Sequence, residues 1–187
     1  MKITVKTGEL IAAVSGAQEA CADKKTAQKR RLDDVKLSVA GNELLVTGLD
    51  GYVAVERTLE GSDCEEGACL VEPSVLVSGL DKTAANTTLT LSGSMLHCQS
   101  PKGEFQVQTA SVSDYPDTTK FWDNGAHTVQ LSVDADDFLR LIQGMKQGKR
   151  GDLLFHISPD NSLAPVCVER RAGQYSRAVL FPVNEEA

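Results

Sequence analysis

The sequence lacks the long apolar segments that would place it in a membrane. No apolar run approaches the roughly 20 residues that a helix needs to cross a bilayer. The first residues, Met1-Lys2-Ile3-Thr4-Val5, alternate like a strand and do not form the apolar centre of a signal peptide. We therefore predict a cytoplasmic protein with no membrane partner.

Cysteine is scarce and odd in number, which argues against a disulfide framework. The five residues are Cys21, Cys64, Cys69, Cys98 and Cys167. Cys64 and Cys69 flank the acidic loop predicted at 65–68, and His97 precedes Cys98, so zinc ligation is one interpretation. No second pair with matching spacing accompanies them, which favours reduced thiols used as small core residues. We expect no metal and no other cofactor.

Catalytic motifs are also absent. The sequence has no phosphate-binding glycine loop, no Gly-x-Ser-x-Gly elbow and no His-Glu-x-x-His motif. His97, His127 and His156 have no recognisable partner spacing, and we interpret them as structural histidines. The paired acids at 33–34 and 136–137 are neighbours in sequence and point different ways, so they do not resemble a general acid–base pair. By elimination, this predicts a binding or scaffold protein that is not an enzyme.

What the sequence does contain is a pattern of one strand, one helix and three more strands, which recurs about every 60 residues in three copies. The first copy places strands at 2–6, 35–39, 44–47 and 52–58 and a helix at 8–22. The second places strands at 68–71, 88–91, 95–99 and 104–109 and a helix at 73–80. The third places strands at 128–133, 153–157, 165–169 and 175–181 and a helix at 135–145.

One such unit cannot bury its own apolar faces, so the repeat predicts similar half-units packed side by side. The predicted fold class is α+β, with antiparallel sheets and with the helices on one face. An all-β sandwich is the alternative, and it would lack the helix at 135–145.

The predicted helices carry apolar side chains at helical spacing. These are Leu10, Val14, Ala17 and Cys21 in the first helix, Leu76 and Leu80 in the second, and Phe138, Leu141, Ile142 and Met145 in the third. Asp134 is placed to cap the third helix, and the acids at 136 and 137 complement its dipole. Each apolar stripe predicts a face that is buried against other elements.

Positive charge is concentrated in two short segments, although the chain has 19 basic and 26 acidic residues and a net charge of −7. The basic residues are Lys24, Lys25, Lys29, Arg30 and Arg31 in the first segment and Arg140, Lys146, Lys149 and Arg150 in the second. Neither segment contains an acid. An acidic protein with concentrated basic patches is suited to meeting a polyanion on one face. Solvated helix ends or loops are the alternative interpretation of each segment.

Four segments, in order along the chain, carry a family resemblance. They are the opening strand 1–5 with the helix after it, the hairpin Leu45-Val46-Thr47-Gly48-Leu49-Asp50-Gly51-Tyr52, the turn Ser113-Asp114-Tyr115-Pro116-Asp117, and the pair Ala164-Pro165-Val166 and Ala178-Val179-Leu180-Phe181-Pro182-Val183. Together with the repeat, these segments resemble the bacterial DNA polymerase sliding clamp, the beta subunit of DNA polymerase III.

The resemblance implies a processivity factor of DNA replication without enzymatic activity, a ring that encircles double-stranded DNA with helices lining the hole. The basic residues of both segments would then face the DNA. The implied domains are a clamp-like domain at 1–117, with half-units at 1–60 and 66–117, then a connector at 118–125. A single half-domain at 126–187 would follow, resembling the C-terminal half of the last clamp domain.

The implied assembly differs from that of a usual clamp subunit, which has six half-units and dimerises. Three half-units per chain leave the third without a partner, which exposes its apolar helix face. Self-pairing about a two-fold axis would cover this face, so we expect a homo-oligomer, either a dimer or a tetramer with twelve half-units. The alternatives are an interaction module that binds clamps or clamp-binding proteins as a regulator or decoy, and a defective clamp remnant.

The resemblance also implies a pocket for short hydrophobic peptides from DNA polymerase, the clamp loader and other clamp-binding proteins. Its positions correspond to Leu49, Ala54, Pro116, Phe121, Val179 and Phe181, which are all apolar, as Leu and Phe anchors require. Phe181 stands where the family usually has Met, which predicts a narrower groove. The alternative is that these residues are ordinary strand and core positions.

Overall fold

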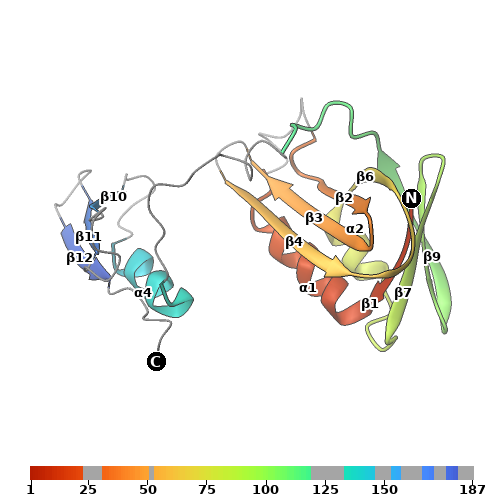
Figure 1. Ribbon diagram of the computed structural model, residues 1–187, viewed down its shortest axis with the longest axis horizontal. Coiled ribbons are helices and arrows are strands. Elements are labelled where there is room, and N and C mark those ends of the chain that lie inside the picture. Colours follow the sequence, from red (N-terminus) through yellow and green to blue (C-terminus); the bar gives the residue numbers. More distant parts are fainter. Residues whose placement is uncertain are drawn as a thin grey trace. The chain divides into compact units, whose positions relative to one another are not determined.

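A computed structural model describes residues 1–22, 31–50, 53–118, 133–145, 153–156, 166–170 and 176–180 of the chain. The chain divides into two compact units, unit 1 at Met1–Asp117 and unit 2 at Thr118–Ala187 (Figure 1). Each unit is described by itself below.

Unit 1 contains two half-units of the predicted design. The first consists of β1 (Lys2–Lys6), α1 (Thr7–Gln18), β2 (Val35–Ala40), β3 (Glu43–Leu49) and β4 (Ala54–Glu60). The second consists of β6 (Gly67–Val71), α2 (Pro73–Gly79), β7 (Asn86–Ser92), β8 (Met95–Ser100) and β9 (Gly103–Ala110). The predicted α+β class and the strand–helix–three-strand order are confirmed.

The two half-units exchange their first strands in one antiparallel sheet of nine strands, ordered β4-β3-β2-β6-β9-β8-β7-β1-β5. Strand β1 of the first half-unit pairs with β7 of the second, and β6 of the second pairs with β2 of the first. The two edge strands of this sheet, β4 and β5, are separated in the chain by Gly61 alone. The sheet therefore curves around the helices; in Figure 1, β3 and β4 lie across α1, which contacts both.

The core of unit 1 is shared by the two half-units. One cluster of buried side chains includes Leu10 and Val14 from α1 together with Leu76 from α2 and Leu89 from β7. Burying a side chain of this size contributes about 1.5–3 kcal/mol. The predicted core positions Leu10, Val14 and Ala17 on α1 and Leu76 on α2 are thus confirmed, and Leu80 at the end of α2 is buried as predicted. Cys21 is the exception, because α1 ends at Gln18 and Cys21 lies beyond it, partly buried. Neither half-unit has this core without the other.

Gly48 allows α1 to approach β3 closely. A Cβ atom at this position would lie 1.9 Å from the carbonyl oxygen of Ala17, which is far inside van der Waals contact. Because the clash is with backbone, a side chain at position 48 would push α1 away from the sheet.

The segment after β4 differs from the prediction. Residues 65–68 were expected to form an acidic loop, whereas β5 (Ser62–Glu65) and β6 are separated by Glu66 alone. Strand β5 pairs with β1 through Lys2↔Glu65 and Thr4↔Ser62. The prediction was wrong because an edge strand needs no apolar alternation, and charged residues are typical of such edges.

Unit 2 contains α4 (Ala135–Met145) and a three-stranded antiparallel sheet of β10 (Leu153–His156), β11 (Val166–Arg170) and β12 (Ser176–Leu180). Helix α4 contacts β12, and its bounds agree with the predicted helix. Residues 128–132 of the strand expected before this helix lie outside the described residues. None of the helices in the described part of the chain is long and apolar enough to cross a membrane.

The apolar stripe of α4 is less buried than the sequence predicts. Leu141 and Ile142 are half-buried, and Phe138 and Leu139 are exposed. In the part of unit 2 that the structure describes, Val168 is the one apolar side chain that is fully buried. The helix has the expected pattern, but its own sheet covers only part of it.

Candidate nucleic-acid interface

Two of the predicted DNA-facing residues, Arg31 and Arg140, lie among the described residues, and each pairs with an aspartate three positions away. Arg31 Nη1 donates to Asp34 Oδ2 at 3.2 Å, and Arg140 Nη2 donates to Asp137 Oδ1. The other predicted residues lie outside the described part: Lys24, Lys25, Lys29, Arg30, Lys146, Lys149 and Arg150. Both described arginines keep exposed side chains, so each has further N–H donors that face solvent.

The ends of the first basic segment are fixed on unit 1. The backbone N–H of Ala22 donates to the carbonyl oxygen of Leu32 at 2.9 Å, and that of Asp34 donates to Arg31 at 3.1 Å. Arg31 has φ 50°, in the left-handed region that non-glycine residues seldom adopt. The chain therefore leaves and returns at one place, which anchors the base of the segment that carries five of the predicted cations.

Asp34 is the buried acid at this base. The residue is 6% exposed, and burial raises the pKa of its carboxyl group above the ordinary value. The hydrogen bond from Arg31 acts in the opposite direction, while the nearby charges of Asp33 and Glu72 raise the pKa further. Arg31 is thus the group that offsets the cost of keeping a carboxylate in this position.

Cys21 completes the same anchor. Its Sγ lies 3.6 Å from the carbonyl oxygens of Ala17 and Asp34, so the thiol can donate to either. Burial raises the pKa of the Cys21 thiol to about 11, which keeps it protonated at neutral pH. A protonated thiol is a hydrogen-bond donor and a poor nucleophile, so this cysteine is structural.

Helices α1 and α2 contribute no basic residue of their own, although the guanidinium of Arg57 from β4 lies against α1 at Gly16. Neither α1 nor α2 contains Lys or Arg. The exposed positions are Gly8, Glu9, Ala12, Ser15 and Gln18 on α1 and Ser74, Val75 and Ser78 on α2. Lys6, at the N-cap of α1, pairs with Glu9 at 2.8 Å. Attraction to phosphate in unit 1 would therefore come from the segment between α1 and β2 and from Arg57 rather than from residues of the helices.

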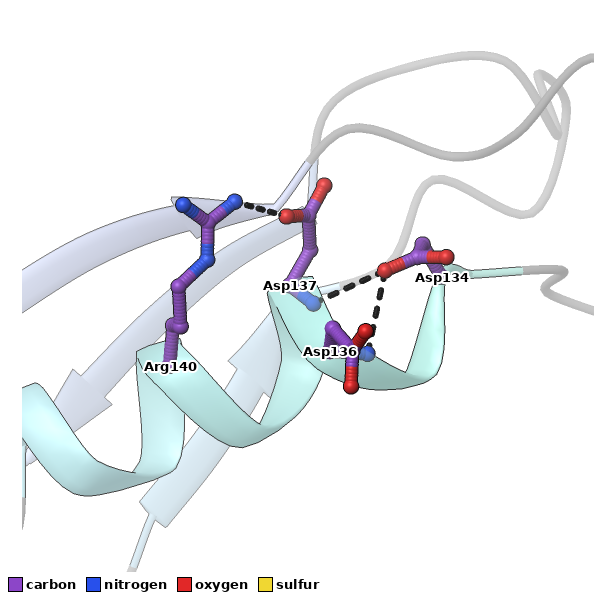
Figure 2. Close-up of polar contacts among 4 residues, drawn as sticks. All are labelled: Asp134, Asp136, Asp137 and Arg140. Atoms are coloured by element: carbon purple, nitrogen blue, oxygen red, sulfur yellow. Dashed lines mark hydrogen bonds and ion pairs between the residues drawn. The ribbon is translucent and has the colours of Figure 1, made fainter.

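The N-terminus of α4 is acidic and capped, as Figure 2 shows. Oδ1 of Asp134 accepts hydrogen bonds from the backbone N–H groups of Asp136 and Asp137, both at 3.0 Å. The guanidinium of Arg140 reaches back to Asp137 on the same helix. The predicted cap is confirmed, and Arg140 lies beside acids at this end of the helix.

Three of the six predicted pocket residues have described side chains. Leu49 and Ala54 pair across the β3–β4 hairpin, and both pack in a cluster with Tyr115. Leu49 is only 3% exposed, so in this conformation it is a core contact; Pro116, which follows Tyr115, is partly buried. The side chains of Phe121, Val179 and Phe181 lie outside the described residues, although the backbone of Val179 is in β12.

Tyr115 fixes the turn that ends unit 1. Its hydroxyl donates to the backbone carbonyl of Thr47 at 3.2 Å, and burial raises the pKa of this phenol. Thr47 Oγ1 in turn donates to Glu56 at 3.0 Å. The turn is thereby held against the β3–β4 hairpin, on which two of the predicted pocket residues lie.

Two hollows in unit 1 lie away from these residues. One, of about 220 Å³, is lined by residues that include Leu80, Asp81, Lys102 and Phe105. The other, of about 460 Å³, lies between β1 and β4. Leu49, Ala54 and Pro116 line neither hollow.

The cysteines and histidines do not gather into a metal centre among the described residues. No group of three or more His, Cys, Asp or Glu side chains in that part could hold an ion. Cys69 and Cys98 are buried core residues, and burial raises the pKa of each thiol to about 12. His97 Nδ1 lies 2.8 Å from Glu104 Oε1 across the β8–β9 hairpin.

Sequence reasoning missed the two aspartates that engage the described arginines. The signal was present, because Arg31-x-x-Asp34 and Asp137-x-x-Arg140 have the i,i+3 spacing at which opposite charges meet in a helix or turn. Both aspartates were considered as members of acid pairs that do not resemble an acid–base pair, and Asp137 also as a partner of the helix dipole. Restricting attention to segments without acids excluded both from the interface.

The fold is similar to solved bacterial sliding clamps. Caulobacter crescentus DNA polymerase III beta matches with a TM-score of 0.75 at 19% identity, over 99% of this chain and 51% of that one. A Bartonella birtlesii clamp bound to griselimycin matches with a TM-score of 0.72 at 16% identity, over 100% and 51% of the two chains. The Helicobacter pylori clamp bound to a DNA ligase peptide matches with a TM-score of 0.68 at 17% identity, over 100% of this chain and 54% of that one. The chain spans about half the length of these clamps.

The sequence comparisons show the family. No curated protein matches the chain. The model of the DNA polymerase III beta subunit, N-terminal domain, matches residues 1–119, which include all of unit 1. This match confirms the resemblance inferred from the sequence, and the chain belongs to the DNA polymerase III beta subunit family.

Proposed function

We propose that the chain is a sliding-clamp-like accessory protein of DNA replication that binds double-stranded DNA without sequence preference. The observation that carries the proposal is a basic, acid-free segment, residues 24–31, whose base is hydrogen-bonded to a clamp-family domain. Contacts to phosphate release counterions and carry no sequence information, so they suit a protein that moves along DNA.

The DNA-facing residues in this proposal are the nine basic residues of the two segments, with Arg31 and Arg140 in supporting roles. Each of these two arginines already has one N–H group directed at an aspartate. The ion pair with the buried Asp34 fixes the guanidinium of Arg31. The remaining N–H groups of Arg31, on its exposed side, are therefore oriented before any phosphate binds.

The proposed role has no catalytic step. The chain would tether partner proteins to DNA by binding their peptides. The residues proposed for this role are Leu49, Ala54 and Pro116 in unit 1 and Phe121, Val179 and Phe181 in unit 2. Support comes from the Helicobacter pylori clamp, which has been solved with a DNA ligase peptide. We expect a peptide ending in Leu-Phe to bind with micromolar affinity and Phe181→Ala to weaken it. Unchanged affinity in that variant would reject the pocket.

The proposal includes self-association, as a dimer or a tetramer. A protein that holds DNA mainly by encircling it needs a closed ring, and this chain spans about half the length of the clamps it matches. Additional copies are therefore required if the described units are to enclose a duplex.

The second candidate function is an interaction module that binds clamps or clamp-binding proteins and never encircles DNA. The observation in its favour is the absence of Lys and Arg from α1 and α2, together with the single acid Glu9 on the exposed face of α1 and the acids at the start of α4. Surfaces of this kind repel phosphate and do not attract it.

Retention on DNA of different topology distinguishes the two candidates. We expect the chain to remain on a nicked circular plasmid through a high-salt wash and to be lost after the plasmid is linearised. Salt-sensitive binding to both forms would indicate contact without ring closure. The absence of binding to either form at low salt would overturn the DNA proposal and support the interaction module.

A further inference from the structure

The three described helices share one pattern of large side chains. Their fourth residues are Leu10 in α1, Leu76 in α2 and Phe138 in α4. The first two are 0% exposed, whereas Phe138 is 36% exposed. Equivalent positions therefore differ sharply in burial between the two units.

The fifth residues follow the same trend. Ile11 in α1 and Val77 in α2 are partly buried against the core, whereas Leu139 in α4 is 52% exposed. Chemical character does not explain this, because Leu139 is as apolar as Ile11 and larger than Val77. The difference lies in what covers each helix.

In unit 1, each half-unit covers the other. Helices α1 and α2 contact each other, and their fourth residues belong to one core cluster. The exchanged strands β1 and β6 hold this arrangement together. Within the described part of unit 2 there is one helix and one three-stranded sheet, with no second helix to play the part that α2 plays for α1.

The exposed apolar side chains in the described part of unit 2 are aromatic as well as aliphatic. The rings of Phe138 in α4 and Phe155 in β10 stack with centroids 6.2 Å apart and an interplanar angle of 29°. Phe155 is 38% exposed. We call Phe138, Leu139 and Phe155 the α4 face. Three large exposed apolar side chains on two adjoining elements are typical of a contact surface.

We propose that the α4 face is a self-association surface that binds the α4 face of a second copy of this chain about a two-fold axis. Unit 1 shows that a half-unit of this design is buried by another half-unit of the same design. A second copy supplies that partner at equal concentration, with the same apolar side chains. The inference deepens the self-association in the proposed function and rests on it.

Charge on α4 selects the relative direction of the two helices. Asp134, Asp136 and Asp137 lie at its N-terminus, whereas the stretch from Leu139 to Met145 contains no acid and one base, Arg140. Parallel pairing would bring six aspartates together. Antiparallel pairing about a two-fold axis places each acidic N-terminus beside the acid-free half of the partner helix, and is favoured.

Sedimentation equilibrium of the whole chain without DNA tests the proposal. We expect a dimer, or a multiple of it, at tens of micromolar. Leu139→Glu should weaken the dimer about a hundredfold, because each dimer loses the apolar contact twice. Leu139 is largely exposed, so the substitution leaves the fold of unit 2 intact, which circular dichroism checks. Leu139→Met keeps an apolar side chain at this position, and we expect this variant to associate as the wild type does.

Val75→Glu is the matched control. Val75 is an exposed apolar residue on α2, and it is the third residue of its helix, where α1 has Glu9. The substitution adds the same charge to a helix of unit 1, and we expect association to be unchanged. A wild-type monomer at tens of micromolar, normal association of Leu139→Glu, or an equal loss in Val75→Glu would overturn the proposal.

A parallel assay with labelled duplex DNA separates this inference from DNA binding. A monomeric chain that binds duplex would overturn the self-association surface and leave the proposed phosphate contacts of the basic segments standing. A dimer that Leu139→Glu dissociates, but that binds no DNA, would support the surface and overturn the DNA proposal.

Discussion

Helices α1 and α4 both have an acid at the third position followed by two large apolar side chains, yet α1 is inside a core and α4 is at a surface. The fourth position is completely buried in α1, at Leu10, and one third exposed in α4, at Phe138. The caps show the opposite trend, because α4 has a side-chain cap from Asp134 and α1 has none. Local signals specify α4 better, whereas packing stabilises α1.

The difference shows that the repeat encodes half-units and that burial depends on pairing them. A helix in this family design needs its own sheet on one side and another half-unit on the other. Unit 1 provides both, so its core draws side chains from α1, α2 and the exchanged strands. The described part of unit 2 provides one sheet, which contacts α4, and a side-chain cap at the start of the helix.

Truncating the fourth helix position should produce the largest contrast between the units. Leu10→Ala should cost about 2–5 kcal/mol, because it leaves a cavity in a fully buried site. Phe138→Ala should cost less than about 2 kcal/mol, because part of the ring is already in solvent and Ala favours helix. Hydrogen exchange of peptides from α1 and α4, at one low protein concentration, measures both. Equal losses of protection would show that the two helices are equally covered.

The two arginine–aspartate pairs offer a second contrast. Arg31→Ala should destabilise unit 1 by about 1–3 kcal/mol at neutral pH, because it leaves the buried Asp34 carboxylate without its cation. Arg140→Ala should leave the stability of unit 2 unchanged, because both side chains of that pair are exposed to solvent.

The Asp34 pair also predicts a pH dependence. The pKa of Asp34 is raised in the folded protein, so the native state binds this proton more tightly than the unfolded state does. The contribution of Asp34 to stability therefore falls as pH rises from the unfolded value, about 4, through the raised folded value. Urea unfolding of wild type and Arg31→Ala at several pH values measures it. The loss in Arg31→Ala should shrink in acid, and a loss independent of pH would show that Asp34 is not the group involved.

The caps predict the smallest effect. Asp134→Ala should destabilise α4 by about 1 kcal/mol, because two backbone N–H groups lose their acceptor. Lys6→Ala at the N-cap of α1 should have no measurable effect on α1, because Lys6 makes no side-chain cap. Exchange protection of the first turns of both helices reports this, and an equal response would contradict the difference in capping.

The fold of unit 1 was predictable because its signals are local and repeated. Alternating apolar residues marked β2, β3 and β8, and Pro73 marked the start of α2. Strand β5 was missed because it is an edge strand of Ser62-Asp63-Cys64-Glu65, whose pairing with β1 is a long-range contact. No periodicity within these four residues distinguishes them from a polar loop.

The candidate interface was less predictable than the fold. Charge concentration identified the segment 24–31, but its anchoring depends on Asp34, which is buried by packing that the sequence does not display. Leu49 has the chemical character of a pocket residue, yet Tyr115 packs against it from a distant part of the chain. Whether an apolar residue lines a groove or fills a core is decided by such long-range contacts.

The salt dependence of binding to a fluorescent duplex tests the central claim most directly. The test variant replaces Lys24, Lys25, Lys29 and Arg30 with Ala. The control variant replaces four lysines elsewhere in unit 1 with Ala, which removes the same charge. These are Lys2, Lys36, Lys82 and Lys102. We predict that the slope of log K against log salt becomes shallower by about 3–4 in the test variant and stays unchanged in the control. Equal slopes in the two variants, or no binding by the wild type at low salt, would contradict the account.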